Sequence, residues 1–326
     1  MTLLERYRRA IDKCYVQSLN DPETEPYKSK YEARKLFEEL YNLDIPPIAS
    51  DLVKDFDLIH ENDSFKFVLA ESSNSTIEIK HRYLIRCLLD YHIATIYNDT
   101  EERNEGESRL NSLLQSIQSV LPHPILSSLG LNIYNQLIII RTSYDDYQQA
   151  IEYARQAEQL YNQSIQFDCY LLQEIIEIDS TISTNERREE FEQIYTHTLF
   201  YLAQIYGKLN DKNQSATYCR RTLERQLSLY QNGQTKYFDP LDWSTNCATL
   251  SQYYMTNHDY ATARYCLQCA DLILEQIRTT NDKFLERHAS FQRCWIKYAV
   301  NLLSKILIEW SDELNGFGSN LIERAR

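Results

Sequence analysis

The scarcity of glycine is the feature that most limits what this chain can fold into. Its 326 residues include only 6 Gly and 7 Pro, whereas average usage is about 7% glycine and about 5% proline. Tight β-hairpins, dinucleotide-binding turns and phosphate-binding loops all need glycine at set positions. The composition therefore argues against P-loop and dinucleotide enzymes, disfavours an all-β fold and predicts an all-α protein.

The charge balance narrows the choice of partners. The chain has 34 Lys+Arg against 47 Asp+Glu, a net charge of -13, and an acidic surface repels nucleic-acid phosphates and anionic lipids. No apolar stretch approaches the roughly 18 residues that a membrane span needs. The longest candidate, 84–97, is interrupted by Arg86, Asp90 and His92. We expect no nucleic-acid binding and no membrane insertion.

The N-terminus and the cysteines favour a cytoplasmic protein. Arg6, Arg8 and Arg9 are not followed by the apolar segment of a secretory signal. An amphipathic transit helix is the alternative, but Glu5 and Asp12 make a first structural helix the better interpretation. In that setting the 8 Cys read as reduced thiols, not as a disulfide framework.

An internal repeat organises the chain. The clearest copy, at 246–277, has the spacing of a tetratricopeptide repeat: a helix A, a turn at 257–259 and a helix B. Ala263 and Ala270 are placed where helix B crosses helix A, because larger side chains would push the helices apart. The other residues that define this copy are Leu250, Ser251, Tyr254, Tyr260 and Leu267.

Three weaker copies lie upstream. Their defining residues are Leu202, Ala203, Tyr206, Ser215, Cys219 and Thr222 in one; Tyr147, Ala150, Ala154 and Ala157 in another; and Ile93, Ala94, Tyr97, Gly106, Leu110 and Leu113 in the third. Ala203 and Ser251 are 48 residues apart, longer than the repeat of about 34 residues. The pattern predicts a degenerate, tetratricopeptide-like α-solenoid of antiparallel helix pairs.

The predicted organisation is a single solenoid domain over 1–326. It comprises N-terminal helices at 1–42, a loop-rich segment at 43–80 with a short helix at 51–58, degenerate helix pairs at 81–277, a long terminal helix at 284–313 and a tail at 314–326. Within the array, the polar stretch 179–190 and the turn-rich stretch 231–243 are predicted to be loops.

The sequence offers no set of residues for catalysis, for a cofactor or for a metal. Cys266 and Cys269 form a C-x-x-C motif, which fits a redox pair, half of a zinc site or two small packing thiols. We favour packing, because the motif falls in mid-helix and no second cysteine pair or H-x-x-x-H completes a zinc set. We therefore expect no enzymatic activity, no cofactor and no metal.

Binding is the remaining class of function, since stacked helix pairs present the A helices along a groove. Tyr201 and Gln204 are three residues apart on one A helix, as are Thr249 and Gln252 on the next, so each pair shares a face. Such uncharged polar residues suit a protein surface. Periodicity alone leaves open the alternative that Tyr201 is core and the glutamines are ordinary exposed residues.

Six segments resemble the kinesin-binding protein family, over nearly all of this chain and about the N-terminal half of the family's length. They are EPYKSKYEAR (25–34), YTHTLFYLAQIY (195–206), YCRRTLERQL (218–227), DPLDWSTNCATLSQYY (239–254), ARYCLQCAD (263–271) and RCWIKY (293–298). The resemblance implies a tetratricopeptide-like solenoid, without enzymatic activity, that holds a kinesin motor head and blocks its attachment to microtubules.

The resemblance also implies a set of partner-binding residues and a cellular setting. The family's contact residues map onto Tyr201, Gln204, Gln226, Thr249 and Gln252. The implied partners are kinesin motor domains, with microtubule-associated proteins as further candidates, in a cytoplasmic, cytoskeleton-associated setting of microtubule-based transport, neurogenesis and differentiation. The alternative is a generic repeat adaptor that binds a peptide or another protein in its groove.

Overall fold

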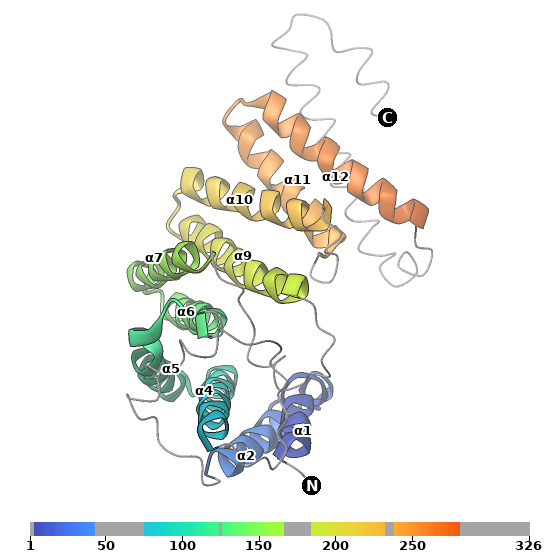
Figure 1. Ribbon diagram of the computed structural model, residues 1–326. Coiled ribbons are helices and arrows are strands. Elements are labelled where there is room, and N and C mark those ends of the chain that lie inside the picture. Colours follow the sequence, from blue (N-terminus) through green and yellow to red (C-terminus); the bar gives the residue numbers. More distant parts are fainter. Residues whose placement is uncertain (1–2, 43–74, 124–125, 166–183, 232–237, 281–326) are drawn as a thin grey trace, which may run out of the picture. The chain divides into compact units, whose positions relative to one another are not determined.

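The computed structural model describes residues 3–42, 75–123, 126–165, 184–231 and 238–280 (Figure 1). Every regular element in these ranges is an α-helix or a short 3-10 helix, which confirms the predicted all-α class. The chain divides into two compact units, Met1–Tyr201 and Leu202–Arg326, and each is described by itself below. That the whole chain forms one continuous array stays a prediction.

Among its described residues, the first unit has six complete helices and most of a seventh. They are α1 (Leu3–Tyr15), α2 (Lys28–Asn42), α4 (Ser75–Asp99), α5 (Arg103–Ile117), α6 (Leu126–Ser143), α7 (Tyr147–Ser164) and α9 (Thr184–Lys208). Three pairs of helices are neighbours in the chain, α1 with α2, α4 with α5 and α6 with α7, and the pairs stack through α2 on α4 and α5 on α6. This is the helix-pair arrangement that the repeat predicts.

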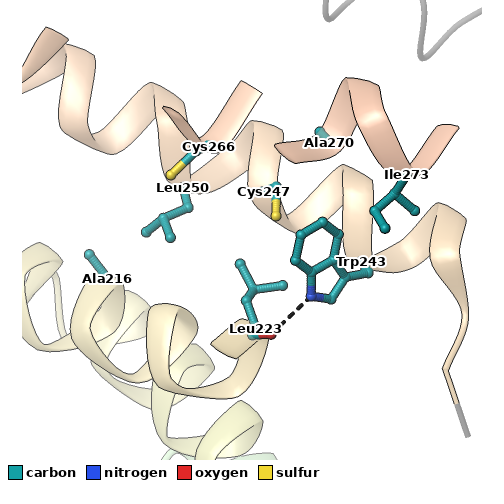
Figure 2. Packing of buried hydrophobic residues seen from close by; sticks show 8 residues of the cluster. All are labelled: Ala216, Leu223, Trp243, Cys247, Leu250, Cys266, Ala270 and Ile273. Atoms are coloured by element: carbon teal, nitrogen blue, oxygen red, sulfur yellow. Dashed lines mark hydrogen bonds between the residues drawn. The ribbon is translucent and has the colours of Figure 1, made fainter. Parts of the chain in front are cut away.

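The second unit holds the end of α9 followed by α10 (Lys212–Gln231), α11 (Pro240–Thr256) and α12 (Tyr260–Thr280). α11 and α12 form the tight pair, and α10 packs on α11. A buried apolar cluster joins the three helices, and Figure 2 shows Leu223, Trp243 and Cys266 within it. The indole Nε1–H of Trp243 donates to the carbonyl oxygen of Leu223 at 3.0 Å, which ties α11 to α10.

The turns between helices A and B repeat one backbone geometry. The middle residue of each turn has a left-handed φ: 68° at Glu101, 58° at Asp145, 59° at Asn210 and 60° at His258. In three of the four turns the next residue is an aspartate whose carboxylate accepts from a backbone N–H three residues on, as Asp259 does from Thr262 at 3.1 Å. This capped turn confirms the predicted turn at 257–259 and shows that the irregular spacing lies outside it.

Small residues lie where helices cross, as predicted. Ala263 is fully buried and Ala270 is 1% exposed, both on α12. Ala150, Ala154 and Ala157 are likewise buried along α7. At Gly106 on α5 the approach to α4 is closer still. A Cβ built on this glycine would overlap the side-chain oxygen of Asn98 and lie 2.9 Å from the carbonyl oxygen of Ala94, both on α4.

Replacing Gly106 with alanine is therefore expected to lower the free energy of unfolding by about 1–3 kcal/mol, the usual cost of overpacking. The backbone oxygen of Ala94 cannot move aside without displacing α4. Gly207 on α9 is the matched control, since a Cβ there meets only the hydroxyl of Ser215, at 3.5 Å. Gly207→Ala should be neutral or stabilising by up to about 1 kcal/mol through helix propensity. Chemical denaturation measures both, and equal effects would contradict the packing argument.

Three predicted loop boundaries are wrong. α11 begins at Pro240, inside the predicted loop 231–243, because proline is well suited to the first position of a helix. The other two errors share one cause. The loop-rich segment was expected to extend to residue 80 and the polar stretch 179–190 to be a loop, but α4 begins at Ser75 and α9 at Thr184. Both helices begin with sequences rich in Ser, Thr, Asn and Glu, and such polar stretches are also typical of loops. The short helix at 51–58, the helix at 284–313 and the tail lie outside the described residues.

Candidate functional site

The polar pair on α9 lies on the surface side of that helix. Leu199, Leu202 and Ile205 turn into the core and are at most 3% exposed. Gln204 is exposed and Tyr201 is half-buried. The structure thus places Tyr201 and Gln204 on a different face from these three core residues, as the spacing predicts. Because Tyr201 is half-buried, it contributes to packing as well.

Tyr201 belongs to an aromatic group that sequence reasoning missed in part. The centroid of its ring lies 6.0 Å from that of Phe200 and 6.5 Å from that of His197. Phe200 is 37% exposed, so part of its ring is available to a partner beside Tyr201. The signal that could have found it is the spacing of His197, Tyr201 and Gln204, which places them along one face of α9 with Phe200 beside it.

Tyr201 also lies close enough to Tyr91, on α4 of the same unit, to affect its ionisation. Burial raises the pKa of Tyr201, and burial is the main cause that raises the pKa of Tyr91 on α4, with the Tyr201 hydroxyl adding to the shift. A hydrogen bond with Gln136 on α6 acts in the opposite direction on Tyr91. Both hydroxyls therefore stay protonated and neutral, and they can donate or accept hydrogen bonds without adding charge.

The polar pair on α11 is fully on the surface. Thr249 and Gln252 are both exposed, while Trp243 and Leu250 on the other side of the helix are each 4% exposed. The Thr249 hydroxyl donates to the carbonyl oxygen of Thr245 at 3.0 Å. This bond uses the hydroxyl's single donor, so the threonine offers a partner its hydroxyl oxygen as an acceptor together with its methyl group.

Gln226 differs from the other four predicted residues. It lies on α10, a B helix, and is half-buried, and its side-chain oxygen is shielded from solvent without a hydrogen-bond partner among the described residues. The structure therefore brings Tyr201 together with Gln204 on α9, and Thr249 together with Gln252 on α11, whereas Gln226 lies on a third helix, α10. That any of the five binds a partner stays a prediction.

The cysteine motif sits in the middle of α12, as expected. Cys266 is 7% exposed, and burial raises its pKa to about 12, so it remains a neutral thiol at physiological pH. Within the part of the chain that the structure describes, no group of three or more His, Cys, Asp and Glu side chains is arranged to hold a metal ion. In the same part, no helix is long and apolar enough to cross a membrane.

Comparison with known proteins finds sequence similarity to KIF-binding proteins. The sequence family described as "KIF-1 binding protein C terminal" matches residues 241–316. The KIF-binding protein of Gallus gallus is 33% identical over 317 residues, which cover 92% of this chain and 48% of that protein. The KIF-binding protein of Homo sapiens is 29% identical over 330 residues, 95% of this chain and 52% of its own length.

A solved structure shows a similar fold. The structure titled "Kinesin binding protein (KBP)" aligns with a TM-score of 0.57 at 26% sequence identity, and the alignment covers 96% of this chain and 58% of that one. The chain thus spans about half the length of the relatives it matches. Which half it corresponds to stays a prediction.

Proposed function

Because this chain is a homologue of the KIF-binding proteins, we propose that it binds kinesin motor domains and keeps them from attaching to microtubules. The observation that carries the proposal is the similarity over 92% or more of the chain to proteins named for kinesin binding. Since the chain spans about half of those proteins, the activity is a proposal for this chain in its own right.

The A-helix faces support the proposal by their chemistry. On α9, the exposed ring of Phe200 and the half-buried ring of Tyr201 lie beside the exposed Gln204. On α11, the exposed pair Thr249 and Gln252 is uncharged. Tyrosine and phenylalanine supply large contact areas and are enriched in protein interfaces. We assign motor contact to Tyr201 and Gln204 on α9 and to Thr249 and Gln252 on α11, with Gln226 on α10 in a lesser, partly structural role.

Charge supports the proposed competition with microtubules. The face of a kinesin that meets acidic tubulin is basic, and this chain carries a net charge of -13. Complementary charge speeds association and favours one partner over another. The proposal includes a cytoplasmic, cytoskeleton-associated location, a regulatory role in microtubule-based transport and no enzymatic activity.

A microtubule co-pelleting assay tests this function. Purified kinesin motor domains are mixed with microtubules, with and without the full 326-residue chain, and we expect the chain to move motors into the supernatant. The double variants Tyr201→Ala/Gln204→Ala and Thr249→Ala/Gln252→Ala should each reduce this release at least about tenfold, because interface hot spots contribute about 2 kcal/mol or more. Their melting temperatures should stay close to that of the parent.

The chain offers controls with the same residue types at the same spacing. Tyr153 and Gln156 lie three apart on α7, and Gln214 and Thr217 lie three apart on α10. Thr217 makes the same hydroxyl-to-backbone bond as Thr249, to Asn213 at 2.8 Å. Alanine substitution of these control pairs should leave motor release unchanged. An equal loss of motor release in the test and control variants, or undiminished release by the test variants, would contradict the assigned surface. If the parent chain captured no motor in a pull-down, that result would contradict the function and favour a general adaptor.

A further inference from the structure

A cleft lies in the second unit, over α11 between α10 and α12. Its volume is about 420 Å³, within the range of roughly 300–1,000 Å³ that small-molecule sites occupy. Figure 2 shows part of its wall, where Leu223 of α10 faces Cys247 and Leu250 of α11. Its lining also includes Arg220 and Glu224 of α10, Trp243 and Tyr254 of α11, and Ala261 and Cys266 of α12.

The inner wall of the cleft is apolar. Leu223, Trp243 and Leu250 are each 4% exposed, so they line the cleft from within the core. Burial raises the pKa of both Cys247 and Cys266, so these thiols are neutral and behave as small apolar groups. An occupant of this part must itself be apolar, because nothing charged on the inner wall would compensate a buried charge.

The charged side chains of the lining, Arg220 and Glu224, form an ion pair on α10, and Arg220 contacts Tyr254 of α11. Trp243 and Tyr254 are eleven residues apart on α11, which corresponds to about 16 Å of helix. At the Tyr254 end, Arg220 is hydrogen-bonded to the Tyr254 hydroxyl, and its Nε lies 2.7 Å from a carboxylate oxygen of Glu224. Both members of this ion pair are 59% exposed, and pairs so exposed contribute at most about 1 kcal/mol.

We propose that this cleft binds a single-chain carboxylic acid, with the carboxylate at Arg220 and Tyr254 and the hydrocarbon chain along α11 towards Trp243. The ligand carboxylate takes the place of Glu224 as the partner of the guanidinium, which presents several N–H donors suited to a carboxylate. The hydrocarbon chain of the ligand stabilises the complex by burying apolar surface, which contributes about 25 cal/mol per Å² to the free energy of binding.

This site is separate from the proposed motor-binding surface. Thr249 and Gln252 are exposed on α11 and do not line the cleft, whereas Trp243, Cys247, Leu250 and Tyr254 of the same helix do. The two sets lie on different sides of α11, as the helical period requires. The inference therefore does not depend on kinesin binding, and its test can fail or succeed independently.

Calorimetric titration of the full chain with dodecanoate, kept below its micelle-forming concentration, tests the proposal. We expect saturable binding of one ligand per chain. Arg220→Gln should weaken binding about tenfold or more, because a charge-assisted hydrogen bond contributes about 1.5–3 kcal/mol. Glu224→Gln should strengthen binding, because it removes the competing carboxylate. Ala261→Trp, at an exposed position on the rim, should block entry without changing the melting temperature.

A second ion pair provides matched controls. Arg155 and Glu152 on α7 form an exposed pair at 3.7 Å in the first unit, so Arg155→Gln and Glu152→Gln change the net charge equally without touching the cleft. These variants should bind dodecanoate like the parent. Absence of saturable binding, equal weakening by Arg155→Gln and Arg220→Gln, or unchanged affinity in Ala261→Trp would overturn the site. Uncharged dodecanol binding as tightly as dodecanoate would overturn the assignment of the carboxylate to Arg220.

Discussion

Truncating Trp243 to alanine is expected to lower the free energy of unfolding by about 3–5 kcal/mol, the range for removing a large aromatic residue from a core. The indole joins α10 to the α11–α12 pair through the apolar cluster and through its bond to Leu223 at 3.0 Å. The neighbouring cleft leaves few atoms that could move in to fill the space. Urea denaturation followed by circular dichroism measures the loss.

Two further variants separate packing from hydrogen bonding at this position. Trp243→Phe keeps most of the ring but loses the N–H donor, and a lost hydrogen bond of this kind contributes about 1 kcal/mol. Tyr265, on α12, is 64% exposed, so Tyr265→Ala should change stability by less than about 0.5 kcal/mol. If Trp243→Ala cost no more than Tyr265→Ala, the cluster would not hold the second unit together.

The first unit is expected to lose stability as the pH falls, because of one buried histidine. His92 on α4 is 1% exposed and stacks on Phe37 of α2, with ring centroids 5.2 Å apart. Its Nε2 lies 3.1 Å from the Tyr7 hydroxyl and its Nδ1 lies 2.8 Å from the Tyr15 hydroxyl. A neutral imidazole has one N–H and one lone pair, so one tyrosine accepts from the ring and the other donates to it.

The direction of the pH effect follows from the pKa of His92. Burial lowers it from 6.5 to about 3 in the folded protein, so the unfolded chain binds the proton first. The stability that the neutral ring contributes is complete above about pH 6.5 and is lost as the pH falls towards 3. Each pH unit in this window costs up to about 1.4 kcal/mol, which gives about 2–3 kcal/mol between pH 6.5 and 4.5.

The variant His92→Gln isolates this effect, since glutamine can both donate and accept a hydrogen bond but does not titrate. Carboxylates also titrate in this range, so the quantity to measure is the difference in unfolding free energy between parent and variant at each pH. That difference should shrink or reverse as the pH falls. His258→Gln, in the exposed turn before α12, should follow the parent curve. Parallel curves for parent and His92→Gln would show that His92 does not govern the acid response.

Much of the local structure was predictable because it depends on neighbours in the chain. The turn at 257–259 follows from residues that favour turns and caps, and it takes the predicted form between α11 and α12. Ala263 and Ala270 follow from the size limit where two helices cross. The surface placement of Thr249 and Gln252 follows from the helical period, since Leu250 sets the direction of the core.

Other features depend on residues that are distant in the chain. Periodicity could not show that Tyr201 lies near Tyr91, that Gln226 is half-buried on α10, or that Tyr7, Tyr15 and Phe37 surround His92. The same holds for the cleft, whose Arg220, Trp243 and Thr262 come from three helices. Repeat spacing and local propensity suffice to predict most of the helices, the turns between them and the faces that they bury. Which polar groups meet cannot be predicted in this way, because burial and pairing depend on how the helices pack.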